Sequence, residues 1–172
     1  MSLRILALLC LLFLSQALAQ QSGSERTSEA PDACPVTKPY QTSLFVPPFP
    51  YPKKPFPDSF WFGTDKLWTS LPTDGAWRGL RGYTPNDPTF RQKLFYWRQG
   101  YGRTEHQPGL TVTGRRLDSP APPLQVDKPN SAWVDSDQAM MVAGVNFPTL
   151  GCWEITSRFE DDELTFVVWV AN

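Results

Sequence analysis

From residue 60 onward, apolar positions occur in short runs that alternate with polar positions and are separated by turn residues. Alternation with a period of two is typical of β strands, and helical spacing of apolar residues is nowhere sustained for three turns. Clusters such as Pro72-Thr-Asp-Gly75 and Pro85-Asn-Asp-Pro88 lie between the runs. The pattern predicts strands at residues 66–71, 90–98, 110–117, 132–134, 139–147, 152–159 and 164–170.

The last two predicted strands form the clearest hairpin, because they flank the acidic tip Glu160-Asp-Asp-Glu163. In residues 164–170, Leu164, Phe166, Val168 and Val170 share one face, and Val167 and Trp169 share the other. With two apolar faces, this strand is expected to be central or covered. Seven short strands indicate an all-β domain at residues 60–172, an immunoglobulin-like β-sandwich, with a small β-barrel as the alternative.

Residues 34–59 form a proline-rich arm ahead of this domain, preceded by a polar segment at 20–33 that we expect to be a flexible leader. The prolines fix φ and remove backbone donors, which favours an extended path. One interpretation lays the arm over the domain, with Phe49, Tyr51 and Phe56 filling surface grooves. The other makes it a ligand for proline-recognising domains. We favour the first, because Cys34 can pin the arm from upstream.

Residues 1–19 are typical of a secretory signal peptide. Arg4 precedes the apolar run Ile5–Leu14, and Ala17-Leu-Ala19 matches the small-x-small cleavage pattern, so the mature chain is expected to begin at Gln20. A membrane anchor is the alternative, but the run is shorter than the roughly 20 residues that span a bilayer. The sequence thus predicts a secreted or periplasmic protein without stable membrane insertion.

Removal of this segment takes Cys10 away and leaves Cys34 and Cys152 as an even pair in an oxidising compartment, which predicts a disulfide between them. Two free thiols are the alternative. Around Cys152, we expect Gly151 to let the chain turn tightly into the strand and Trp153 to pack on the bridge. Glu154 is expected to form an ion pair with an arginine, one of Arg115, Arg116 and Arg158, rather than to act as a catalytic acid.

The charge is unevenly distributed along a chain whose formal net charge is −1. Residues 78–116 hold eight basic and two acidic side chains, and residues 117–172 hold nine acidic and two basic ones. A basic stretch with interleaved aromatics is one signature of polyanion binding. Pairing of basic and acidic strands across a sheet is the simpler interpretation, so nucleic acid is not an expected partner.

The residues for common catalytic and metal sites are scarce. His106 is the only histidine, no Gly-x-Ser-x-Gly motif surrounds a serine, and zinc would need several His or Cys ligands. Acidic turns such as Asp135-Ser-Asp137 match no calcium loop. We therefore expect no catalytic residue, no cofactor and no metal. A hydrolase built on His106 or on a carboxylate pair that includes Glu154 is the alternative.

Seven tryptophans offer both core volume and flat rings. Those inside predicted strands are expected in the core, whereas two in turn-rich stretches could present a ring to a sugar. The candidate binding surface is therefore Trp61, Trp77, Tyr101, Arg103 and His106. For the two tryptophans, a packing role is the competing interpretation.

The C-terminal segments Phe147-Pro-Thr-Leu-Gly-Cys-Trp-Glu-Ile-Thr156 and Leu164-Thr-Phe-Val-Val-Trp-Val170 resemble a signature of uncharacterised bacterial secreted proteins and are similar to immunoglobulin-like extracellular domains. Residues 66–68, 90–97 and 110–118 resemble the same group more loosely. It implies an extracytoplasmic β-sandwich and transfers no catalytic residue. The proline-rich arm is outside it.

The leading hypothesis from the sequence is a secreted, non-enzymatic binding or interaction protein whose partner is another protein or a cell-envelope component. A carbohydrate-binding module that uses exposed aromatic rings is the second hypothesis.

Overall fold

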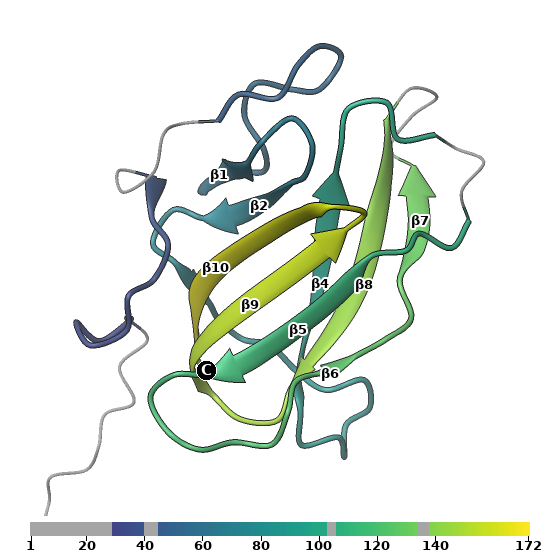
Figure 1. Cartoon of the computed structure of the whole chain (residues 1–172). Coiled ribbons are helices and arrows are strands. Elements are labelled where there is room, and N and C mark those ends of the chain that lie inside the picture. The colour runs from purple at the N-terminus through teal and green to yellow at the C-terminus, as the bar shows by residue number, and fades with distance from the viewer. Residues whose placement is uncertain (1–28, 40–44, 103–105, 134–137) are drawn as a thin grey trace, which may run out of the picture.

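A computed structural model describes residues 29–39, 45–102, 106–133 and 138–172. Two β sheets face each other in these residues, with β10, β9 and β5 in front of β4 and β8 in Figure 1. The sheets are not closed into one barrel, so the predicted β-sandwich is confirmed over the alternative. Among the described residues, there is no helix long and apolar enough to cross a bilayer.

The first sheet has the order β1-β2-β4-β8-β6, with β7 also paired to β8, and the second has the order β3-β10-β9-β5. The strands are β1 (Ser59–Gly63), β2 (Trp68–Pro72), β3 (Ala76–Trp77), β4 (Phe90–Trp97), β5 (Thr111–Arg116), β6 (Gln125–Val126), β7 (Asn130–Trp133), β8 (Ala139–Phe147), β9 (Gly151–Phe159) and β10 (Asp162–Val170). All seven predicted strands are present, and three further strands, β1, β3 and β6, were not predicted.

The β9–β10 hairpin forms the centre of the second sheet. Its register runs from Asp162↔Phe159 to Val170↔Gly151, and β3 pairs with the other edge of β10 in parallel. Leu164, Phe166 and Val168 point into the core between the sheets. The prediction that residues 164–170 form a central strand is therefore confirmed.

A buried hydroxyl pair links the two sheets inside this core. Tyr96 of β4 and Ser157 of β9 are both fully buried, and their side-chain oxygens lie 2.6 Å apart. Burial raises the pKa of Tyr96 well above its usual range, so the phenol stays protonated and can donate or accept in this bond. The pair gives the otherwise apolar core one directional contact between the sheets.

The proline-rich arm covers the outer face of the first sheet at one end. Trp61, Trp68, Trp97 and Met140 form a cluster on that face, and Tyr51 of the arm is buried among them. Tyr51 donates to the Arg98 carbonyl at 3.2 Å, and Trp61 Nε1 donates to the Pro52 carbonyl at 2.8 Å. The expectation that Tyr51 fills a groove is confirmed.

For the other two aromatic residues of the arm, that expectation is wrong. Phe49 is 95 % exposed in a turn, and Phe56 is 60 % exposed with one ring contact, to Phe95. Pro47 and Tyr51 are the buried residues of this stretch, so the arm docks through these two positions rather than through every aromatic ring.

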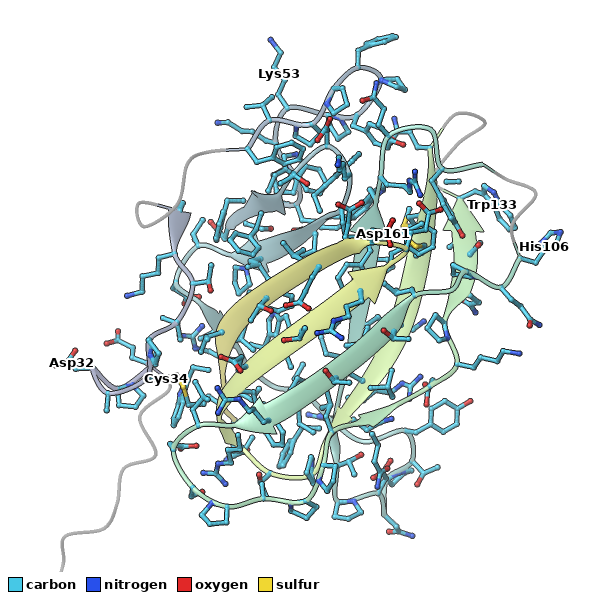
Figure 2. All side chains as sticks on the ribbon, viewed as in Figure 1. Asp32, Cys34, Lys53, His106, Trp133 and Asp161 are labelled. Atoms are coloured by element: carbon cyan, nitrogen blue, oxygen red, sulfur yellow. A yellow bond between two sulfur atoms is a disulfide. The ribbon has the colours of Figure 1, made fainter. Side chains whose placement is uncertain are left out.

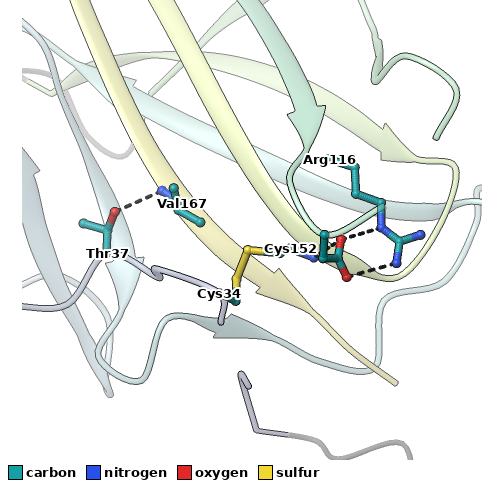
Figure 3. The surroundings of a disulfide bond; sticks show 6 residues. Cys34, Thr37, Arg116, Cys152 and Val167 are labelled. Carbon is teal, nitrogen blue, oxygen red and sulfur yellow. Dashed lines mark hydrogen bonds and ion pairs between the residues drawn. A yellow bond between two sulfur atoms is a disulfide. The ribbon is translucent and has the colours of Figure 1, made fainter. Parts of the chain in front are cut away.

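The predicted disulfide joins Cys34 to Cys152 across a sequence separation of 118 (Figure 3). Beside it, Thr37 pairs with β10: Thr37 N–H donates to the Val167 carbonyl at 2.9 Å, and Val167 N–H donates to Thr37 Oγ1 at 3.0 Å. The disulfide and these two bonds hold residues 34–37 against the second sheet.

The expected packing of Trp153 on the disulfide is wrong. Neighbouring strand residues point to opposite faces, so Cys152 faces outward while Trp153 points into the core and packs on Phe147, with ring centroids 5.4 Å apart. Val36, Leu117, Val167 and Trp169 surround the bridge instead. Gly151 has a φ of 139°, which favours glycine, and it lies at the start of β9 as expected.

A cross-strand ion pair between the basic and the acidic stretch confirms the predicted pairing. Arg115 of β5 lies opposite Glu154 of β9, with Nε 2.6 Å from Oε1. Arg158 of β9 also lies opposite Glu163 of β10 at 2.5 Å, a pair formed within the acidic stretch itself. Glu154 thus forms an ion pair with one of the three arginines that the sequence offered.

The hydroxyl pair between the sheets predicts a coupled response to mutation. Tyr96→Phe leaves the Ser157 hydroxyl buried without its partner, which should cost about 1–3 kcal/mol of unfolding free energy, and Ser157→Ala should have a similar effect. The double variant should lose clearly less than the sum of the two. Urea unfolding of the four proteins measures the coupling, and additive losses would contradict the bond.

The disulfide predicts a large stabilisation, because it closes a long loop in the unfolded chain. Cys34→Ser with Cys152→Ser should lower the unfolding free energy by about 5 kcal/mol. Limited proteolysis of the reduced protein should then cleave within residues 34–39, which the oxidised protein protects. Identical cleavage with and without reductant would show that the bridge does not hold this segment.

Candidate functional site

The candidate site is a groove where the first sheet separates between β2 and β4. β1 and β2 pair from Ser59↔Pro72 to Gly63↔Trp68, and β4 and β8 pair from Phe90↔Phe147 to Tyr96↔Met141. Between β2 and β4, pairing in these strands is limited to Trp68↔Trp97 and Thr69↔Tyr96. The rest of β2 therefore lies apart from β4.

The turn after β2 explains this separation. The chain turns at residues 72–75 and crosses to the second sheet, where Trp169 N–H donates to the Gly75 carbonyl at 2.9 Å and β3 pairs with β10. Gly75 has a φ of 74°, and a Cβ there would collide with Val36, so glycine is needed on both counts. The end of β2 follows this crossing away from β4.

The resulting groove has a volume of about 590 Å³, with an apolar floor and a polar rim. Leu71, Leu94 and Trp77 form the floor, and all three are buried. Residues 56–59 at the end of the arm and residues 92–95 of β4 line its sides, and the rings of Phe56 and Phe95 are in contact. A large apolar side chain that entered from the outer face would meet both sheets.

The wall formed by β4 has an unpaired edge. Arg91 N–H donates to the Arg81 carbonyl at 3.1 Å, and the Phe95 carbonyl accepts from Thr69 Oγ1 at 2.8 Å, which places the backbone of these alternate residues on the groove side. Lys93 lies between them, and its N–H donates to Oε1 of the neighbouring Gln92 at 3.0 Å rather than to a strand. A backbone donor of β4 is thus covered by a side chain alone.

Two charged groups at the rim, Asp74 and Lys93, differ in whether they have a partner of opposite charge. Asp74 Oδ1 accepts from Ala76 N–H at 3.0 Å, and Oδ2 pairs with Arg78 at 2.7 Å. Desolvation by burial raises the pKa of Asp74, but these hydrogen bonds and the Arg78 charge outweigh it, so the pKa lies below its usual range. Lys93 is exposed on the facing wall, and its ammonium group has no carboxylate partner among the described residues.

Of the four predicted surface residues that the structure describes, Trp77 alone lines this groove. It is 8 % exposed and packs against Phe147 and Phe166, so its ring does not form a stacking platform on the surface. Trp61 is buried beneath the arm. The interpretation of both tryptophans as packing residues therefore holds.

Tyr101 and His106 lie away from the groove. Tyr101 is buried with its hydroxyl 2.6 Å from Ser131 Oγ, and Arg103 is outside the described residues. His106 is exposed, and its ring centroid lies 6.1 Å from that of Trp133 (Figure 2). The structure therefore does not join the four described residues into one surface.

Three residues were not among the predicted site residues: Gln92 and Lys93, which supply the groove's unpaired edge, and Tyr83, which is 79 % exposed. A lysine on the outer face of a predicted strand gave no local signal, because the missing neighbour strand is a tertiary feature. Tyr83 was overlooked because it lies in a stretch recognised only as a turn. Within the described residues, no group of His, Cys, Asp and Glu side chains could hold a metal ion.

Comparisons of the chain with protein-family models, curated proteins and solved structures found no match. The groove must therefore be interpreted from its own geometry.

Proposed function

We propose that this is an exported, non-enzymatic binding protein that takes a peptide segment of a protein partner into the groove between β2 and β4. The observation that carries the proposal is the separation of the first sheet, which leaves the β4 edge at Lys93 without a neighbouring strand above an apolar floor. Strand edges of this kind bind extended peptides through their main chain.

The groove also indicates the side chains that such a peptide would carry. A large aliphatic or aromatic residue suits the floor of Leu71, Leu94 and Trp77, because burial of one such side chain contributes roughly 1.5–3 kcal/mol. A carboxylate next to it would meet the Lys93 ammonium group at the rim. The backbone of the peptide would replace Gln92 Oε1 as the acceptor for Lys93 N–H.

Export is part of the proposal and is supported by two features. The first 19 residues have the pattern of a signal peptide. The Cys34–Cys152 disulfide is of the kind that persists in oxidising compartments. Within such a compartment, a protein partner or a cell-envelope component that displays an extended segment is a suitable ligand.

The shifted pKa values among the carboxyl groups have structural causes, so the proposal assigns no catalytic residue. Asp74, Asp87 and Asp118 each accept backbone and side-chain hydrogen bonds at a turn or strand end, which lowers the pKa. Glu154, named for the hydrolase alternative, is paired with Arg115.

The proposal is tested by selecting peptides that bind and by filling the groove with a bulky side chain. The mature protein is used to select peptides from a displayed library of short random sequences, and the affinities of selected peptides are measured by calorimetry. Ser70→Trp places a bulky ring in the groove and should weaken binding by about tenfold or more. Thr113→Trp makes a comparable change on an exposed strand position of the second sheet and should leave the affinity unchanged.

We expect the selected peptides to share an apolar residue next to an acidic one. If selection enriches no peptide, or if Ser70→Trp and Thr113→Trp weaken binding equally, the groove is not the binding site.

A further inference from the structure

A second hollow lies on the outer face of the first sheet, beyond the part that the arm covers. It has a volume of about 370 Å³ and is lined by Tyr83, Asp87, Thr89, Arg91, Gln125, Asp127 and Asn146. These residues come from the loop before β4, from β4 and β8, and from β6 and the residue after it. None of them lines the peptide groove.

The strand register places three planar polar side chains in one row across the sheet. Arg91 of β4 lies opposite Asn146 of β8, and Asn146 lies opposite Gln125 of β6. Gly144 is two residues before Asn146 on the same face. A Cβ at Gly144 would collide with Asp127 Oδ2 and Arg91 Nη2, so the glycine makes the room that these two charged groups occupy.

Arg91 fixes the orientation of its neighbours. Its Nη2 forms an ion pair with Asp127 Oδ2, its Nη1 donates to Asn146 Oδ1 at 3.1 Å, and its guanidinium carbon lies 5.4 Å from the centroid of the Tyr83 ring. Asn146 therefore directs its Nδ2 hydrogens away from Arg91, and Asp127 keeps Oδ1 as an acceptor. Both groups are held before any ligand arrives.

Asp87 holds the loop that carries Tyr83. Its Oδ2 accepts from Tyr83 N–H at 2.9 Å, and its Oδ1 accepts from the Thr89 N–H at 2.9 Å and the Thr89 hydroxyl at 2.7 Å. These bonds, led by the one from the Thr89 hydroxyl, lower the pKa of Asp87, so the loop keeps this anchor at neutral pH. The ring of Tyr83 is nevertheless 79 % exposed.

An exposed aromatic ring beside fixed amide and carboxylate groups suits a neutral sugar. Apolar C–H faces of a pyranose pack on an aromatic ring, and its hydroxyls donate to a carboxylate and accept from an amide. Asp127 neutralises Arg91, and the remaining carboxylate is that of Asp87, so the site has no excess positive charge for a phosphate or another anion. We infer that this hollow binds a neutral hexose unit of an oligosaccharide.

The test titrates the mature protein by calorimetry with soluble hexasaccharides of glucose, mannose, galactose and N-acetylglucosamine. We expect at least one to bind, and Tyr83→Ala and Gln125→Ala each to weaken that binding by about tenfold or more. Tyr83→Trp, which keeps an aromatic ring, should retain it. Phe49→Ala removes an even more exposed ring, from the arm, and should have no effect.

Two results would overturn the inference: no binding of any of these sugars at millimolar concentration, or binding that Tyr83→Ala and Gln125→Ala leave unchanged. The groove-filling variant Ser70→Trp separates this site from the peptide groove, because it should leave sugar binding intact. Each proposal can therefore fail without the other.

Discussion

Burial of two apolar faces on one sheet is the constraint on which the rest of this structure depends. The inner face of the first sheet packs against the second sheet, but its outer face also presents Trp61, Trp68 and Trp97. A two-layer sandwich covers only one face of each sheet, so the second apolar face needs a further cover. The proline-rich arm provides it, because an extended segment can bury Tyr51 while its prolines have no N–H groups to satisfy.

The arm covers only part of this outer face, and both proposed sites lie outside the part that it covers. The arm ends at residues 56–59, on the wall of the groove where β2 and β4 separate. Further along β4 the outer face becomes polar, with Arg91 opposite Asn146. One face thus changes from a sealed aromatic cluster to an open apolar groove and then to a polar hollow, and Lys93 lies between the two open regions.

Much of this fold could be predicted from the sequence, because its strongest signals are local. The hairpin of β9 and β10 follows from alternation and from an acidic turn, and the Arg115–Glu154 pair follows from charges on the outer face of strands. β3 and β6 have two residues each and are strands only because they pair with β10 and β8, so no local pattern indicates them. The burial of Trp61 and Trp77 could not be predicted from local sequence either, because the arm and the opposite sheet cover them.

The sites depend on contacts between residues far apart in sequence. Arg91 and Asp127 meet because β4 and β6 both flank β8, which only the strand order reveals. The groove depends on a strand that is missing beside Lys93, and a sequence pattern does not show a missing neighbour. Alternation could place Lys93 on the outer face of its strand, but it could not indicate that its N–H lacks a strand partner.

The central claim is that the β4 edge is open at Lys93, and backbone amide hydrogen exchange measured by NMR tests it most directly. Leu94 N–H lies on the β8 side of β4, within a continuous ladder, whereas Lys93 N–H is covered by Gln92 Oε1 alone. The account predicts that the Lys93 amide exchanges much faster than the Leu94 amide under native conditions. Equal protection of the two amides would show that another segment already pairs with this edge, and the groove would then be closed to a partner.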